Sequence, residues 1–141
     1  MNKQAKKYQT QWASQFYVAA ELTRPGHLVS LTLGNAPVAD LLVVSPNQKH
    51  FMVDVKGLST KNFWLIKRRE PREELFYVLV YLPRNFEPPK FSILSSANLM
   101  EEIDKLKIQY ISEGKTWDYD MEGINWSSAF EYENRWDVLP E

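Results

Sequence analysis

The sequence predicts an α/β fold in which a mixed central β-sheet is flanked by helices. Three observations predict it. A helical pattern near the N-terminus is followed by three short apolar stretches with the spacing of strands, and a strongly apolar stretch then precedes a second helical pattern. The expected core order is α-β-β-β-α-β. A chain of 141 residues with 44% hydrophobic residues is long enough to bury the core of one domain spanning residues 1–141.

The first helix is expected over residues 10–24, with Thr10 as its N-cap and Pro25 directly after its end. Glu21 follows an apolar run, residues 16–20, and we expect this turn of the helix to be buried. A buried carboxylate is costly unless it is paired or binds a metal ion. The sequence leaves two interpretations open for Glu21, a metal ligand or an ion pair with Arg24 at a helix end.

The next elements are a strand over residues 28–33 and a hairpin formed by residues 40–45 and 50–56. A tight turn centred on Asn47 places Asp40 opposite Asp54. Side chains alternate along a strand, so Asp54 and Lys56 share a face. The stretch 40–45 is apolar on both faces, which predicts a central strand covered on both sides.

Two carboxylates directly opposite each other destabilise a sheet, and a cation between them offsets the repulsion. A divalent metal ion bound by the two carboxylates, with Lys56 beside it, would offset this repulsion. The alternative is an ordinary ion pair between Asp54 and Lys56, with Asp40 as a turn residue after Pro37.

This arrangement resembles the PD-(D/E)XK nuclease superfamily, which has the restriction-endonuclease-like fold. The matching residues are Glu21 in the first helix, Asp40 where the second strand begins, and Asp54-Val55-Lys56 on the third. Residues 16–22, 29–36 and 132–139 also resemble a small, mostly bacterial group of stand-alone domains in that superfamily. The resemblance covers nearly the whole chain.

The resemblance implies phosphodiester hydrolysis assisted by a hard divalent cation, Mg²⁺ or in its place Mn²⁺. It implies Asp40, Asp54 and the carbonyl of Val55 as metal ligands. It further implies Glu21 as the ligand of a second ion or of a metal-bound water, and Lys56 as the residue that orients the attacking water.

A basic segment follows the hairpin. Residues 61–72 hold five basic residues and one acidic residue, with two aromatic residues between them, and residues 63–69 are expected to form a fourth strand. This pattern favours a nucleic-acid-binding edge. The alternative is a solvated edge on which basic residues discourage aggregation. The candidate nucleic-acid-binding residues are Lys61, Lys67, Arg68 and Arg69.

The remaining chain is expected to be scaffold. Residues 76–82 predict a central strand and residues 91–94 another. A helix is expected from a cap at Ser95 or Ser96 to Ser112, ended by Gly114. Residues 113–141 predict an irregular tail, rich in aromatic and acidic residues, that packs on the core. Its expected anchors are Trp117, Trp126, Phe130 and Trp136.

The chain has no apolar run long enough to span a membrane and no apolar region typical of a signal peptide. The absence of cysteine excludes disulfides and fits a cytoplasmic protein.

The leading hypothesis is a Mg²⁺-dependent nuclease that acts on DNA. The alternatives are a non-catalytic domain of the same fold that binds nucleic acid or a protein, and a structural protein. Cutting both strands of a duplex needs two sites, which favours a homodimer.

Overall fold

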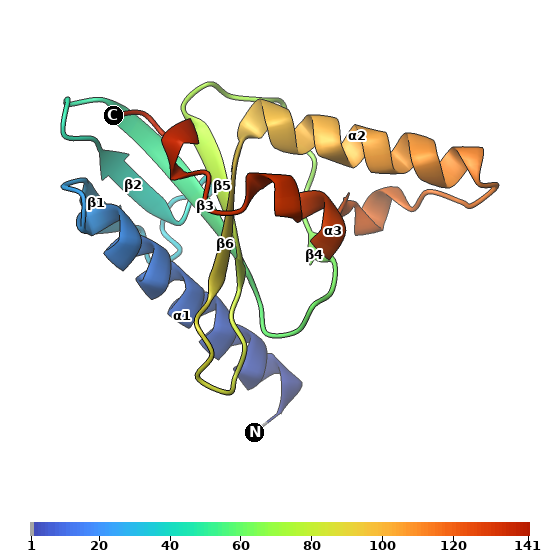
Figure 1. Cartoon of the computed structure of the whole chain (residues 1–141), viewed down its shortest axis with the longest axis horizontal. Coiled ribbons are helices and arrows are strands. Elements are labelled where there is room, and N and C mark those ends of the chain that lie inside the picture. The colour runs from blue at the N-terminus through green and yellow to red at the C-terminus, as the bar shows by residue number, and fades with distance from the viewer. Residues whose placement is uncertain (1) are drawn as a thin grey trace.

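The computed structural model describes residues 2–141, and its centre is a mixed sheet of five strands in the order β1-β2-β3-β5-β6 (Figure 1). The predicted α/β class with a mixed sheet between helices is therefore confirmed. The strands of this sheet are β1 (Leu28–Leu31), β2 (Leu41–Val44), β3 (His50–Leu58), β5 (Leu75–Tyr81) and β6 (Lys90–Ser95).

The hairpin of β2 and β3 has the predicted register. Leu41 lies opposite Val53 and Val44 lies opposite His50, as a turn centred on Asn47 requires. The N–H of Ser45 donates to the carbonyl of Lys49 at 2.8 Å, which closes the turn. Asp40 directly precedes β2, and its N–H donates to the carbonyl of Val53 at 3.1 Å.

The connection after β3 differs from the expected α-β-β-β-α-β order. β5 runs parallel to β3, and the connection between them contains no helix, only the two-residue strand β4 (Trp64–Leu65). The predicted strand over residues 63–69 is thus wrong in length and in place, because β4 pairs with β7 (Gly123–Ile124) in a separate two-stranded sheet. The segment also contains Pro71, which disfavours a helix interior.

The two faces of the sheet bury separate apolar cores. On one face, Val18 and Leu22 of α1 (Lys3–Thr23) and Leu139 near the C-terminus pack on the sheet. On the other, α2 (Ser96–Ser112) and the β4–β7 pair cover the strands, with Trp64, Leu99 and Ile103 among the buried residues. β5 is buried at six of its seven positions, as predicted for a central strand. Helices therefore lie on both faces.

β2 is not covered on both sides, although its apolar sequence predicted that it would be. Leu41 and Val43 face the core under α1, but Leu42 is 44% exposed on the other face. The covering elements of that face lie over β5 and β6, so they leave the outer strands β1 and β2 bare.

Helix α1 (Lys3–Thr23) begins earlier than predicted. Asn2 is its N-cap, and the Asn2 side chain accepts a hydrogen bond from the N–H of Ala5 at 2.8 Å. Thr10 is instead a buried residue inside the helix. The first two turns are almost entirely exposed, so they carry no apolar stripe from which the sequence could predict them.

Helix α2 (Ser96–Ser112) confirms the predicted second helix, with Ser95 as N-cap and Gly114 at φ +76° after its end. The C-terminal segment then contributes β7, the short helix α3 (Trp126–Ala129) and three 3₁₀ turns, Tyr119–Met121, Phe130–Tyr132 and Trp136–Val138. It packs on both faces of the sheet, through Trp136 on one and Trp126 on the other. No helix within residues 2–141 is long and apolar enough to cross a membrane.

Gly57 marks the place where α1 comes closest to β3. A Cβ added at Gly57 would overlap the Ser14 hydroxyl and would lie 2.9 Å from the Ser14 Cβ. We expect Gly57→Ala to lower the free energy of unfolding by about 1–3 kcal/mol, the usual cost of overpacking. Urea unfolding measures it.

The Ser14→Gly background is the matched control. Removing the obstructing side chain should make Gly57→Ala markedly less costly than in the wild type. An equal cost in both backgrounds would contradict the proposed contact.

Candidate functional site

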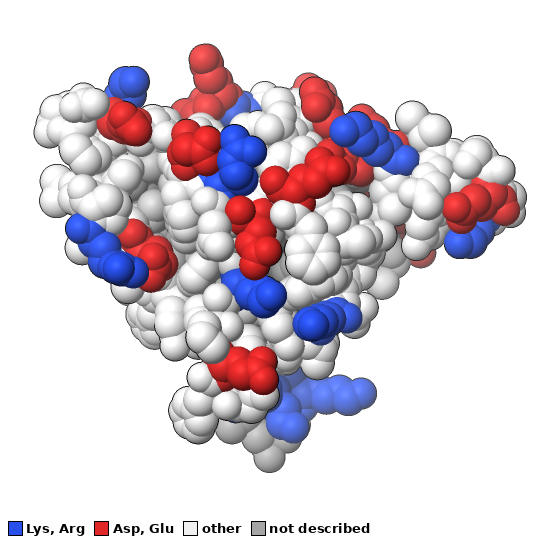
Figure 2. All heavy atoms as spheres, in the orientation of Figure 1, with Lys and Arg blue, Asp and Glu red and all other residues white. Residues whose placement is uncertain are grey.

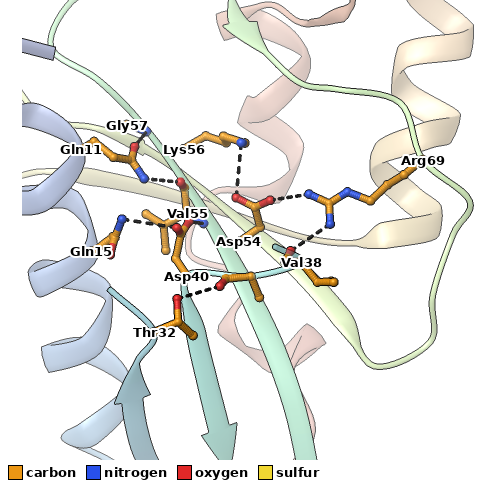
Figure 3. A network of polar contacts seen from close by, with 11 residues as sticks. Gln11, Gln15, Thr32, Val38, Asp40, Asp54, Val55, Lys56, Gly57 and Arg69 are labelled. Atoms are coloured by element: carbon orange, nitrogen blue, oxygen red, sulfur yellow. Dashed lines mark hydrogen bonds and ion pairs between the residues drawn. The ribbon is translucent and has the colours of Figure 1, made fainter. Parts of the chain in front are cut away.

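Asp40 and Asp54 lie side by side where β2 begins, as Figure 3 shows. Asp40 directly precedes Leu41, the first residue of β2, which lies opposite Val53. Asp40 is close enough to Asp54 to raise its pKa. The structure therefore brings together the two carboxylates that the sequence singled out.

Asp40 is held by hydrogen bonds from two elements. Its Oδ2 accepts the N–H of Val55 at 2.8 Å, and its Oδ1 lies 3.4 Å from the side-chain amide of Gln15 on α1. The first bond exists because β3 continues beyond the start of β2. The Val55 N–H has no β2 backbone opposite it, so the carboxylate takes the place of a strand carbonyl.

Gln11 forms hydrogen bonds with the next backbone groups of β3 that no strand pairs. Its side-chain amide donates to the carbonyl of Val55 at 2.7 Å and accepts the N–H of Gly57 at 3.2 Å. A single glutamine thus replaces a neighbouring strand over two residues. The Val55 carbonyl, which the resemblance implies as a metal ligand, keeps one lone pair that Gln11 does not use.

Asp54 is buried, with 5% of its surface exposed, and two cations contact it. Arg69 lies 2.8 Å from its Oδ2 and Lys56 lies 3.4 Å from its Oδ1. Burial, the largest cause, and the neighbouring Asp40 together raise the pKa of Asp54 to about 6, against the lowering effect of Lys56 and Arg69.

Tyr77 lies beside Asp54 in the next strand, because β3 and β5 pair these two residues. Its side chain is fully buried, and its hydroxyl makes no hydrogen bond to residues 2–141. Burial raises the pKa of Tyr77 to about 12. The guanidinium of Arg69 lies 5.7 Å from the centre of the Tyr77 ring, which helps to hold it against Asp54.

Glu21 does not join Asp40 and Asp54. It pairs with Arg24 at 3.1 Å and lines a hollow with Pro46 and Asn47, at the turn end of the hairpin and therefore away from the start of β2. Among the described residues there is no group of three acidic or histidine side chains placed to hold a metal ion. The α1 residue that does reach Asp40 is Gln15.

The predicted basic cluster does not form one free surface. Arg68 pairs with Glu122 at 2.8 Å and with Asp104 at 2.8 Å, and Arg69 points inward to Asp54. The cause is the β4–β7 pair, which brings the basic segment against the acidic C-terminal segment. On the face shown in Figure 2, basic and acidic side chains alternate without a continuous basic area.

Lys67 and Lys61 remain exposed at the surface. Lys61 lies over the rings of Trp126 and Tyr81, with its Nζ 5.4 Å and 6.0 Å from their centres. These two lysines are the members of the predicted cluster that have no ion pair among the described residues.

Sequence reasoning missed Gln11, Gln15 and the inward role of Arg69. A signal for the glutamines was present, since Gln11, Gln15, Val18 and Leu22 have the spacing of one helix face. Polar residues within a buried helix stripe usually have a specific partner. No local pattern could assign Arg69 to Asp54, because the contact depends on the path of the chain between β3 and β5.

The donor set fits Mg²⁺ in number and kind. Magnesium keeps several waters and needs only one or two carboxylates together with phosphate oxygens. Asp40 and Asp54 supply two carboxylates, and burial of Asp54, together with the closeness of Asp40, raises the pKa of Asp54. Lys56 and Arg69 already balance both charges, so a metal ion would compete with them for Asp54.

Comparison with known proteins gives no match to a family model, to a curated protein or to a solved structure.

We expect the free energy of unfolding to depend on pH because the pKa of Asp54 is raised in the folded state. The folded state holds the proton more tightly than the unfolded chain, in which the pKa is about 3.9. The contribution of Asp54 to stability is therefore full below about pH 4 and is lost as the pH rises through about 6.

The Asp54→Asn variant cannot lose a proton at this position. Between pH 4 and pH 7 the wild type should therefore lose about 2 kcal/mol of its free energy of unfolding relative to this variant. Urea unfolding across this range measures the difference, and NMR titration of the Asp54 carboxyl locates the pKa directly. A constant difference at all pH values would contradict the raised pKa.

Proposed function

We propose that the chain is a divalent-metal-dependent nuclease that hydrolyses phosphodiester bonds in DNA, with Asp40, Asp54 and Lys56 as its central residues. The observation that carries the proposal is the closeness of the Asp40 carboxylate to that of Asp54, with Lys56 two residues further along the same face of β3. Two close carboxylates beside a lysine, one of them the buried Asp54, are uncommon as mere structure, because the arrangement brings like charges together.

The topology supports a restriction-endonuclease-like fold. An N-terminal helix packs on one face of an antiparallel β1-β2-β3 meander, and the next strand of the sheet runs parallel to β3. The candidate residues lie at the start of β2 and on β3, as in the resemblance drawn from the sequence. The connection from β3 to β5 departs from the expected order, since it has no helix.

The residues have distinct roles in this proposal. Asp40 and Asp54, with the carbonyl of Val55, would hold Mg²⁺, and the ion would lower the pKa of a bound water and polarise the phosphate. Lys56 would orient the water and offset charge on the phosphate. Gln15 positions Asp40, and Gln11 fixes the Val55 carbonyl. Lys61 and Lys67, which stay exposed, would contact the nucleic-acid backbone.

One observation favours the second candidate function, a non-catalytic domain that binds nucleic acid or protein. Arg69 and Lys56 already neutralise Asp54 without any metal ion. Ion pairs that already balance the charge of Asp54 can have a purely structural role. In that case they only join the segment after β4 to the sheet. Metal binding separates the two functions.

The first test is calorimetric titration of Mn²⁺ and Mg²⁺ into the wild type and Asp54→Ala, with cleavage of plasmid and branched DNA measured on the same samples. Binding and cleavage should both be lost in the variant, because it removes one of two carboxylate ligands. Asp120→Ala, which removes an exposed acid elsewhere, is the control and should keep both activities. A wild type that binds no metal and cuts no substrate would leave the non-catalytic function.

The second test concerns Arg69. Because its guanidinium occupies Asp54 Oδ2 at 2.8 Å, Arg69→Gln should strengthen Mn²⁺ binding by about tenfold or more, which corresponds to about 1.4 kcal/mol. Arg68→Gln is the matched control, since it removes the same charge one residue away but contacts Glu122 instead. Equal effects of the two variants would show that only net charge matters and would contradict direct competition.

A further inference from the structure

The strand β1 forms an edge of the five-stranded sheet, on the opposite side of the sheet from β6 (Figure 1). Thr32 N–H donates to the carbonyl of Asp40, and this pair continues the register in which Ser30 lies opposite Leu42. Hydrogen-bonded pairs alternate along an antiparallel ladder, so the backbone groups of Leu28 and Ser30 point to β2. The N–H and C=O groups of Val29 and Leu31 therefore point away from the sheet.

These four backbone groups make no hydrogen bond within residues 2–141. The other edge of the sheet is different, because the C-terminal segment covers it. Ser92 of β6 forms a bridge with Glu133, and the N–H of Asn134 donates to the carbonyl of Phe91 at 2.8 Å. In the described part of the chain, the main sheet thus has one edge closed by its own chain and one edge open.

The open edge also lacks the usual protection against pairing. Proteins discourage edge-to-edge contact with charged residues, prolines or bulges, and β1 is Leu-Val-Ser-Leu without any of these. Beside it, the bare face of the outer strands exposes apolar side chains. Leu28 is 69% exposed and Leu42 is 44% exposed, and both line a groove of about 430 Å³ that continues to His50 and Met52.

We propose that two copies of the chain pair through β1 to form a homodimer with a continuous ten-stranded sheet. A second copy fits this edge because β1 carries no charge, so two identical strands meet without repulsion. The presence of a single open edge also matters, since edge pairing then ends at two copies and cannot extend to a filament. A strand of another protein is the competing occupant of this edge, and it is the one that a chain staying monomeric in the experiment below would favour.

The geometry fixes the register of the pairing. A two-fold axis perpendicular to the sheet keeps each face on its own side, so opposite residues must share a face. Val29 of one copy then lies opposite Leu31 of the other, and Ser30 lies opposite its own equivalent on the axis. This register joins all four free groups of each β1 in four hydrogen bonds, two for each Val29–Leu31 pair.

The dimer has a consequence for the carboxylate site. Since each face stays on its own side, the two Asp54 side chains lie on the same side of the ten-stranded sheet. Five strand spacings separate one β3 from the other, which is about 24 Å across the strands. The pairing does not depend on the proposed nuclease function, but it would present two sites to one extended ligand.

Sedimentation equilibrium of the full chain, from about 1 μM to about 1 mM, tests the pairing. The wild type should approach twice the chain mass of 16.6 kDa. Ser30→Lys and Ser30→Asp each place like charges directly opposite on the axis, so either variant alone should dissociate about tenfold or more readily. An equimolar mixture of the two should dimerise again, because opposite charges then meet.

Ser127→Lys, at an exposed position of α3, is the control and should dimerise like the wild type. Circular dichroism and the unfolding midpoint check that each Ser30 variant is folded. A wild type that stays monomeric over the whole range overturns the proposal. A dimer that Ser30→Lys and Ser30→Asp leave unchanged overturns it as well, because its interface must then lie elsewhere.

Discussion

The position of the whole site depends on one constraint, which is that β3 is longer than its neighbour β2. Beyond Val53, the backbone of β3 has polar groups that no strand pairs, and buried groups of this kind require partners. Asp40 accepts the Val55 N–H, and Gln11 bonds both the Val55 carbonyl and the Gly57 N–H. The helix α1 must lie close to β3 for this to occur, and Gly57 permits that distance. The docking of α1, the hydrogen bonding of β3 and the placement of Asp40 thus depend on one another.

This constraint gives Asp40 two roles that are hard to separate by mutation. It accepts a hydrogen bond from the backbone of β3, and it also lies next to Asp54. Asp54 has no backbone partner among the described hydrogen bonds and is held by Arg69 and Lys56 instead. The chemistry of the site is therefore best probed at Asp54, whereas changes at Asp40 also alter the end of the sheet.

The sequence predicted most of what local patterns determine. The register of the β2–β3 hairpin follows from one turn, and α2 follows from its apolar stripe and caps. The contacts that it did not predict join distant segments through single residues. Arg69 reaches Asp54 because the chain after β3 crosses to β5 without a helix, and Arg68 reaches Glu122 because β4 pairs with β7. Neither path has a periodic signal, since β4 and β7 have only two residues each.

The charges at the site also limit what it can bind. Two carboxylates face two cations, so the group is neutral when nothing else is bound. A divalent cation at Asp40 and Asp54 would give this group a charge of plus two in a partly buried position, which is costly unless an anion enters with it. A phosphodiester meets that requirement, and Arg69, once released from Asp54, would lie near it. Metal and phosphate should therefore bind together more tightly than either alone, a coupling that a purely structural ion pair does not produce.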